Sequence, residues 1–240
     1  TTPGPVNAGV QLAVGRMFDL PNDIVAVLAI DGGAEPSQEF HLALNLYDAL
    51  GNRSLRQSIA VSATSANAPQ SAVMADFTGD GFDDLALSFG KTAGQIVIIQ
   101  AADVTNWDAG VLVGPAFVSD KVFLALAAAS VDGKRPLHLV AVTAGSTPSG
   151  EGAEMVVLSI DPVTLQLSQQ ASTPLAGVTQ VADIVGGNYD ENPTDDEIVV
   201  VTAGAAIDST VASLYAFGGN PLSATLLNTA TVPSVLPVDK

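Results

Sequence analysis

The stretch MADFTGDGFDDLALSFG, residues 74–90, concentrates side chains that bind cations. Asp76, Thr78, Asp80, Asp83 and Asp84 place five acidic or hydroxyl groups within nine positions, directly before an apolar run. Calcium takes about six to eight oxygen ligands from carboxylates, hydroxyls, carbonyls and water. The stretch therefore predicts a bound cation at the turn that leads into a buried strand.

The whole chain is acidic and contains no cysteine. Its 240 residues include 25 acidic and 8 basic side chains, which gives a net charge of −17. Such a charge opposes binding to nucleic-acid phosphates and to anionic membrane surfaces. Without cysteine, disulfides, zinc–thiolate sites and cysteine nucleophiles are excluded. No apolar run reaches the roughly 18 residues needed to span a bilayer, so we expect no membrane insertion.

Short apolar runs rich in β-branched residues follow one another along the chain. Examples are DIVAVLAI, QIVIIQ, LHLVAV and EIVVV, and Gly, Pro, Asn, Asp and Ser separate the runs. This pattern is typical of many short strands and predicts an all-β fold. Several runs are nearly continuous rather than alternating, so we expect both faces of those strands to be covered.

These runs form four repeat units. Anchors at Asp23, Asp84, His138 and Glu197 are spaced by 61, 54 and 59 residues, and each is followed by a turn and further apolar runs. The units, about residues 9–70, 71–122, 123–178 and 179–236, each hold four predicted strands. Units of about 60 residues and four strands favour the blades of a single β-propeller over residues 1–240. A β-sandwich with accidental similarity between its strands is the alternative.

The second unit resembles a known repeat. ADFTGDGFDDLALSFG is similar to the FG-GAP or VCBS-type repeat, whose pattern is Asp-x-Asp/Asn-x-Asp-Gly-x-x-Asp followed by an apolar strand. The resemblance implies the blades of an integrin-α-like propeller, with calcium in the loop. Propellers of this family usually have more than four blades. The chain is therefore expected to be a piece of a larger propeller, and closure with four blades is the alternative.

Alternate residues of this loop are the predicted calcium ligands. Thr78 stands where the family has Asn or Asp, so its hydroxyl or a water would serve, and Phe82 can offer only its carbonyl oxygen. Asp83 is expected to point outward. The alternative is an Asx-rich turn satisfied by its own backbone amides. The predicted ligand set is Asp76, Thr78, Asp80, Phe82 and Asp84.

The fourth unit carries a similar loop with one inserted residue, GGNYDENPTDDEIVV. Its oxygen-bearing side chains still alternate, which predicts a looser calcium site. A solvated acidic turn is the alternative. The predicted ligands are Asn188, Asp190, Asn192 and Asp196.

The remaining two loops are expected to hold no ion. In the third unit Lys134 replaces the middle carboxylate, and we expect its ammonium group to pair with Asp132 in place of a cation; Ser130 and His138 fill the outer positions. In the first unit, alignment on Asp23 makes GRMFDLPND one residue short and places Arg16 at the leading position.

Catalysis is not expected. The two histidines, His41 and His138, lie in predicted strands, and no G-x-S-x-G, P-loop or dinucleotide motif occurs. Trp107 would either stack on a sugar or, as we favour, cover the end of a blade.

The predicted function is therefore that of a non-catalytic, calcium-binding propeller. We expect it to act outside the cell or at the cell surface, with the periplasm as an alternative, as an adhesion, interaction or structural subunit. Its expected partners are proteins or a larger surface complex. A carbohydrate-binding propeller lectin with a glycan partner, or an accessory domain of a larger secreted enzyme or toxin, are the alternatives.

Overall fold

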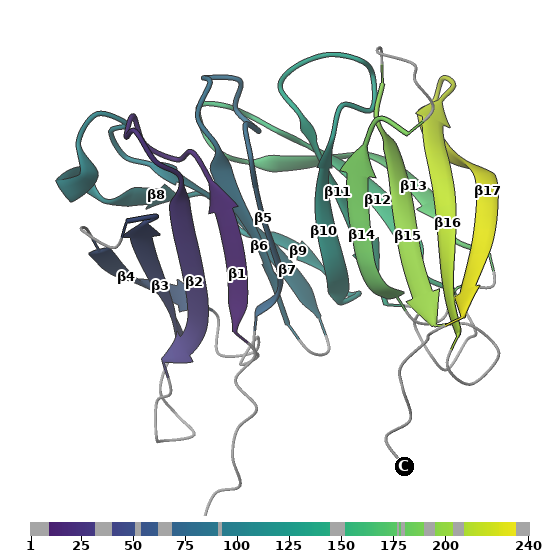
Figure 1. Ribbon diagram of the computed structural model, residues 1–240, viewed down its shortest axis with the longest axis horizontal. Helices are drawn as coiled ribbons and strands as arrows, with labels where there is room; N and C mark the ends of the chain where they lie inside the picture. The colour runs from purple at the N-terminus through teal and green to yellow at the C-terminus, as the bar shows by residue number, and fades with distance from the viewer. Residues whose placement is uncertain are drawn as a thin grey trace, which may run out of the picture. The chain divides into compact units, whose positions relative to one another are not determined.

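The computed structural model describes residues 10–31, 40–50, 54–61, 69–90, 93–144, 152–176, 178, 181–189, 195–203 and 209–233 (Figure 1). These residues form seventeen strands, and their helical content is limited to the 3-10 helix η2 (Trp107–Ala109). The all-β prediction is confirmed. Within the same ranges no helix has the length and apolar character needed to cross a membrane.

The chain forms two compact units. Unit 1 comprises Thr1–Phe123 and Ile160–Ser168, and unit 2 comprises Leu124–Ser159 and Gln169–Lys240. Unit 1 contains two antiparallel sheets, in each of which strands that follow one another along the chain are paired. Sheet 1 has the order β1 (Gln11–Gly15), β2 (Ile24–Asp31), β3 (Phe40–Asp48) and β4 (Ser54–Val61). Sheet 2 has the order β5 (Pro69–Ala75), β6 (Asp84–Phe89), β7 (Gly94–Ala101) and β8 (Val111–Val113), and β9 (Phe117–Ser119) also pairs with β7.

Unit 2 holds most of sheet 3 and all of the described strands of sheet 4. Each is four-stranded, and its strands are again ordered as they follow along the chain. Sheet 3 is made of β10 (Phe123–Ala129), β11 (His138–Thr143), β12 (Glu154–Ile160) and β13 (Leu167–Pro174). Sheet 4 is made of β14 (Val181–Gly187), β15 (Glu197–Ala203), β16 (Ser209–Gly218) and β17 (Ser223–Pro233). Each of the four predicted repeat units thus contains one sheet.

The last strand expected in the second unit is divided. GVLVGPAFV forms β8 and β9 on either side of Gly114 and Pro115, and both short strands pair with β7. Proline has no N–H to donate to a ladder, so it interrupts the strand. Gly114 still donates its N–H to the carbonyl of Ile98 at 2.8 Å.

Each unit has one hydrophobic core, between its two sheets. In unit 1, Ile24, Leu28 and Leu46 of sheet 1 pack with Leu85 and Ile99 of sheet 2, and all five are fully buried. In unit 2, the corresponding core contains Val140 and Val157 of sheet 3 together with Ile198, Val200 and Tyr215 of sheet 4. Burial of alternate apolar side chains is the main favourable contribution to such packing.

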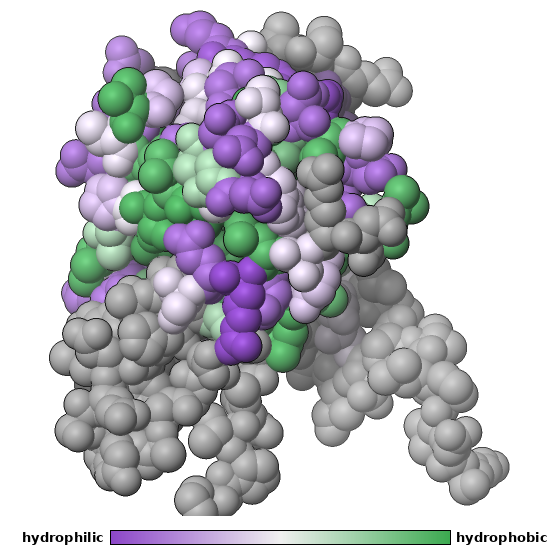
Figure 2. Space-filling model, turned by 90° about the vertical axis from the view of Figure 1, so that its left-hand side faces the viewer, coloured by the Kyte–Doolittle hydropathy of each residue, from purple (hydrophilic) through white to green (hydrophobic). Residues whose placement is uncertain are grey.

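The apolar strands β6 and β7 are covered on both faces. Every residue of β6 is buried, and so are all residues of β7 except Gln100. The prediction is confirmed for these two strands, but not for β15, whose Val199 and Val201 are only half-buried. Other apolar side chains stay at the surface, including Leu12 and Val14 of β1. Figure 2 looks onto the side of the molecule where β3 and β4 lie in Figure 1, and hydrophobic side chains gather there among hydrophilic ones.

Candidate metal centre

The loop from Asp76 to Asp83 joins β5 to β6. Ala75 and Asp84 are the last paired residues of the two strands, so Asp84 begins β6. The Phe77 side chain is fully buried and anchors the loop in the protein interior. All five predicted ligands of the second unit therefore lie in this loop or at its end.

Asp76 holds the first half of the loop. Its Oδ1 accepts a hydrogen bond from the Gly79 amide at 2.6 Å, and its Oδ2 accepts one from the Gly81 amide at 3.2 Å. Gly79 and Gly81 have φ angles of 80° and 90°, which glycine adopts with little strain. The carboxylate is itself buried, with 7% of its residue surface exposed. Two short turns thus wrap the chain around the Asp76 carboxylate.

Asp84 holds the loop from the other side. Its Oδ2 accepts hydrogen bonds from the amides of Phe77 and Thr78, at 3.1 Å and 3.0 Å. The residue is 2% exposed. The pKa of Asp84 is raised to about 7, mainly because burial desolvates the carboxylate and also because of the Asp80 charge, while the Thr78 hydroxyl and the two amides oppose the rise. An ionised Asp84 is therefore costly in this loop without a nearby positive charge.

The Thr78 hydroxyl is a second buried polar group of the loop whose hydrogen bonding is incomplete. Its Oγ1 is buried and has no hydrogen-bond partner of ordinary geometry among the described residues. The hydroxyl nevertheless acts on Asp84, because it lowers the pKa of that carboxyl group. Asp80 is exposed, and its Oδ1 accepts from the amide of Phe82 at 2.8 Å. The loop thus combines two buried carboxylates, one buried hydroxyl oxygen and one exposed carboxylate.

These side chains do not converge on one point. Across the described ranges, no three His, Cys, Asp or Glu side chains are grouped closely enough to hold a metal ion. The carboxylates of Asp76, Asp80 and Asp84 are instead engaged by loop amides, as the Asx-turn alternative expects. A bound ion would therefore require at least one of these carboxylates to move.

The Asp83 side chain points out of the loop, as expected, but it reaches sheet 1. Its Oδ2 accepts a hydrogen bond from the Arg16 amide at 2.7 Å, and its own amide donates to the Arg16 carbonyl at 2.8 Å. Arg16 directly follows β1, so this reciprocal pair of hydrogen bonds links sheet 1 to sheet 2. We call this arrangement the intersheet clamp. Sequence reasoning missed it because the two residues are 67 positions apart.

The same clamp occurs in unit 2. Asp196 Oδ2 accepts from the Ser130 amide at 2.7 Å, and the Asp196 amide donates to the Ser130 carbonyl at 2.9 Å. Ser130 directly follows β10, as Arg16 follows β1. Asp196, one of the predicted ligands of the fourth loop, is therefore turned towards sheet 3. Asp190 and Asn192, two of the other predicted ligands, lie outside the described residues.

Glu197 takes the place of Asp84 in the fourth loop. It pairs with Gly187 at the end of β14, so Asn188 corresponds to Asp76. Glu197 Oε2 accepts the amide hydrogen of Tyr189 at 2.7 Å, while Oε1 is buried without a hydrogen-bond partner among the described residues. The residue is fully buried. Its position as the first residue of the apolar run EIVVV was the signal that could have identified it as a site residue.

The third loop is closed by its own polar groups. Lys134 Nζ lies 3.9 Å from Asp132 Oδ2, which confirms the predicted pair, and the Lys134 amide donates to Asp132 Oδ1 at 3.1 Å. The Ser130 hydroxyl donates to the Lys134 carbonyl at 3.1 Å. His138, at the place of Asp84, has a buried Nδ1 without a hydrogen-bond partner among the described residues, and desolvation lowers its pKa.

The first loop is not one residue short. Gly15 pairs with Ile24, so Ile24 rather than Asp23 takes the place of Asp84, and the loop has the same length as the one between Ala75 and Asp84. The Arg16 guanidinium lies 3.1 Å from Asp19 Oδ1 and 5.4 Å from the centre of the Phe82 ring. A cation of the chain itself thus lies beside the second loop.

Trp107 is part of the core of unit 1. It is 7% exposed, and its ring centroid lies 4.9 Å from that of Phe18. It presents no open ring face on which a sugar could stack. His41 lies in β3, as expected for a strand residue.

The sequence matches no protein-family model, and no curated protein is significantly similar to it. Its function must therefore be inferred from the loops and sheets described above.

Proposed function

We propose that the chain is a calcium-binding repeat protein of the FG-GAP or VCBS type, whose four sheets are blades of a β-propeller. It would act as a non-catalytic interaction or structural subunit outside the cell or at its surface. The resemblance of residues 74–90 to the repeat motif supports this proposal, as does the recurrence of one antiparallel sheet in every repeat unit.

The observation that carries the calcium proposal is the burial of Asp84 beside other acidic groups. A carboxyl group with 2% exposure and a pKa of about 7 is poorly stabilised as an anion, and the buried Thr78 hydroxyl has no other partner among the described residues. A calcium ion would supply the missing positive charge and tie the loop to the start of β6. Asp76, Thr78, Asp80, Asp84 and the Phe82 carbonyl would hold it.

The fourth loop is proposed as a second, weaker site. Glu197 repeats the pattern of a buried acid that binds one loop amide and keeps one buried oxygen without a partner in the described part of the chain. Asn188 lies at the leading position of this loop, as Asp76 does in the second.

Unfolding with calcium and with a chelator tests the proposal. A ligand that binds only the folded state raises its stability by mass action, so the midpoint of thermal unfolding should rise with calcium concentration. The Asp80→Ala variant should lose most of this shift. The control is Asp120→Ala, which changes an exposed acid of unit 1 outside the loop.

Calorimetric titration should find one tighter calcium site and at most one weaker one. An unchanged unfolding midpoint together with no measurable heat of binding would contradict the calcium proposal, and four equal sites would contradict the graded assignment of the loops. The proposed location has a separate test: protease added to intact cells of the source should cleave the protein if it is exposed at their surface.

A further inference from the structure

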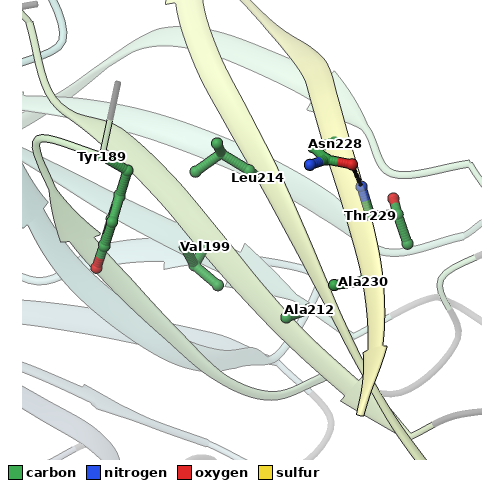
Figure 3. Close-up of a pocket in the computed structure, with 7 residues that line it drawn as sticks. All are labelled: Tyr189, Val199, Ala212, Leu214, Asn228, Thr229 and Ala230. Carbon is green, nitrogen blue, oxygen red and sulfur yellow. Dashed lines mark hydrogen bonds between the residues drawn. The ribbon is translucent and has the colours of Figure 1, made fainter. Parts of the chain in front are cut away.

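Sheet 4 has one apolar face that nothing in the described part of the chain covers. Ile198 and Val200 of β15 are buried against sheet 3, whereas Val199 and Leu214 point to the opposite face and are only half-buried. This opposite face contains a hollow of about 220 Å³ over β15, β16 and β17 (Figure 3). The residues that line it are Tyr189, Val199, Ala212, Leu214, Asn228, Thr229 and Ala230.

Strand register shows what covers the same positions in sheet 1. The pair Gly187 and Glu197 in sheet 4 matches the pair Gly15 and Ile24 in sheet 1. Val199 therefore takes the place of Ala26, and Leu214, its partner on β16, takes the place of Leu46.

Ala26 and Leu46 are fully buried, because they belong to the core that sheet 2 covers. The open face of sheet 4 is thus of the kind that, in unit 1, receives a following sheet.

The outer face of sheet 1 resembles the face by which such a following sheet packs. Leu12, Val14 and Tyr47 are exposed by 62%, 59% and 40%. By register, Leu12 and Val14 take the places of Ala72 and Met74, which pack against sheet 1 from sheet 2.

The third exposed residue, Tyr47, has a direct counterpart in unit 2. It pairs with Val25 as Tyr215 pairs with Ile198, and Tyr215 is buried against sheet 3. The outer face of sheet 1 therefore repeats, position by position, surfaces that elsewhere cover a preceding sheet.

Two smaller features agree with this match. Gly15 leaves room for Met74, since a Cβ added at Gly15 would lie 2.9 Å from the Met74 Cβ. Gly187 is the equivalent glycine of sheet 4, and the three atoms nearest to a Cβ added there belong to the Tyr189 side chain, at 3.5 Å. At Asp23, sheet 1 has an exposed carboxylate at the position that Asp83 and Asp196 use for the intersheet clamp.

We propose that the apolar face of sheet 4 binds the outer face of sheet 1 of a second copy of this chain. Leu12 and Val14 of the second copy would cover the hollow and Gly187, and Asp23 would bond to the backbone of the sheet that it covers. The contact is head to tail, so the two copies use different surfaces. Two such contacts between two copies close a dimer, and contacts that do not close extend a chain of copies. This proposal does not depend on a calcium ion.

The test measures the mass of the protein in solution by light scattering during size-exclusion chromatography, at roughly 0.15 M salt to screen the repulsion between acidic copies. The monomer has a mass of 24.2 kDa. We expect the wild type at tens of micromolar to show twice that mass or more. Val14→Lys and Val185→Lys alter exposed residues of the two opposing faces, Val185 being the β14 partner of Val199, and should each give a monomer. Val163→Lys, at a residue that is 87% exposed and outside both faces, is the control and should leave the mass unchanged.

Mixing the two variants separates this contact from other modes of association. Val14→Lys keeps an intact sheet 4 face and Val185→Lys keeps an intact sheet 1 face, so an equimolar mixture should recover a species of twice the monomer mass. Asp23→Ala should weaken each contact about fivefold, the effect of one lost hydrogen bond. Circular dichroism checks that each variant is folded, and Leu214→Lys replaces Val185→Lys if that variant is not.

A monomeric wild type would overturn the proposal, whether its faces stay open, meet each other within one chain, or take a different partner. A mixture that stays monomeric would overturn it too. So would a variant of one face that still dimerises alone, because that result would show a contact between identical faces.

Discussion

The Arg16 amide donates to Asp83 Oδ2 at 2.7 Å, and the Asp83 amide donates in return to the Arg16 carbonyl at 2.8 Å. Ser130 and Asp196 repeat this relationship in unit 2. In both places the acid directly precedes the second strand of a sheet, and the next residue, Asp84 or Glu197, is an acid that binds its own loop. Two adjacent carboxylates thus have separate structural roles.

Replacing the carboxylate of an intersheet clamp should lower the stability of the unit in which that clamp lies. Asp196→Ala leaves the partly buried Ser130 amide without its acceptor, and we expect a loss of about 1–2 kcal/mol in the free energy of unfolding. Asp83→Ala should cost about 1 kcal/mol or less, because the Arg16 amide is more exposed and water can replace the acceptor. Urea unfolding measures both values. An Asp196→Ala variant as stable as the Asp120→Ala control would show that the clamp contributes nothing.

The backbone of the loop between β5 and β6 should require glycine at position 81. Gly81 has a φ of 90°, and a Cβ added there would meet nothing within 4 Å, so Gly81→Ala tests backbone conformation alone. We expect a loss of about 1–2 kcal/mol in stability and weaker calcium binding. Gly218→Ala is the matched control, since a Cβ there is also free of contacts and its φ is not positive. Equal stability of the two variants would contradict the expected strain.

Asp84 should make the calcium-free protein less stable as pH rises. Its pKa is about 7 in the folded state and 3.8 ordinarily, so between these values the folded state binds more protons than the unfolded state. Stability therefore falls from about pH 4 to about pH 7, by up to roughly 1.4 kcal/mol per pH unit for this one group. Urea unfolding in the presence of a chelator should show this slope, and Asp84→Asn should reduce it. Identical slopes for wild type and variant would mean that Asp84 ionises normally.

His138 should have the opposite effect on stability. Desolvation lowers its pKa, so the unfolded state takes up a proton before the folded state as pH falls below about 6.5. The stability of the wild type relative to His138→Gln should therefore decrease on acidification through this range. The comparison of urea midpoints at about pH 7.5 and about pH 5.5 measures the difference, and a pH-independent difference would argue against the lowered pKa.

The strands and loops were predictable because their signals are local. The apolar run that begins at Asp84 ends a loop with glycines at positions 79 and 81, and the structure places a strand and a turn there. The roles of Asp83 and Asp196 were not predictable in the same way. Their partners lie 67 and 66 residues away, and those partners contribute main-chain groups that no side-chain pattern reveals.

The error in the first loop has a similar origin. Asp23 resembles Asp84 in type, but strand register, which sequence does not display, aligns Ile24 with Asp84. The side chains of the second loop were correctly located in one turn. Their hydrogen bonds to loop amides were foreseen only as an alternative, because the same oxygen atoms suit a cation and an amide equally well.

The intersheet clamp constrains its two sides unequally. On one side the acid must be retained, because its length and charge place an oxygen at the neighbouring amide. On the other side only the main chain takes part, so Arg16 and Ser130, which have no side-chain chemistry in common, serve equally. The clamp itself therefore sets no requirement on the side chains at those two positions, and different residues can replace one another there over evolutionary time. Sheets that descend from one ancestral sheet could then lose sequence similarity on the main-chain side of each clamp while the clamp itself is retained.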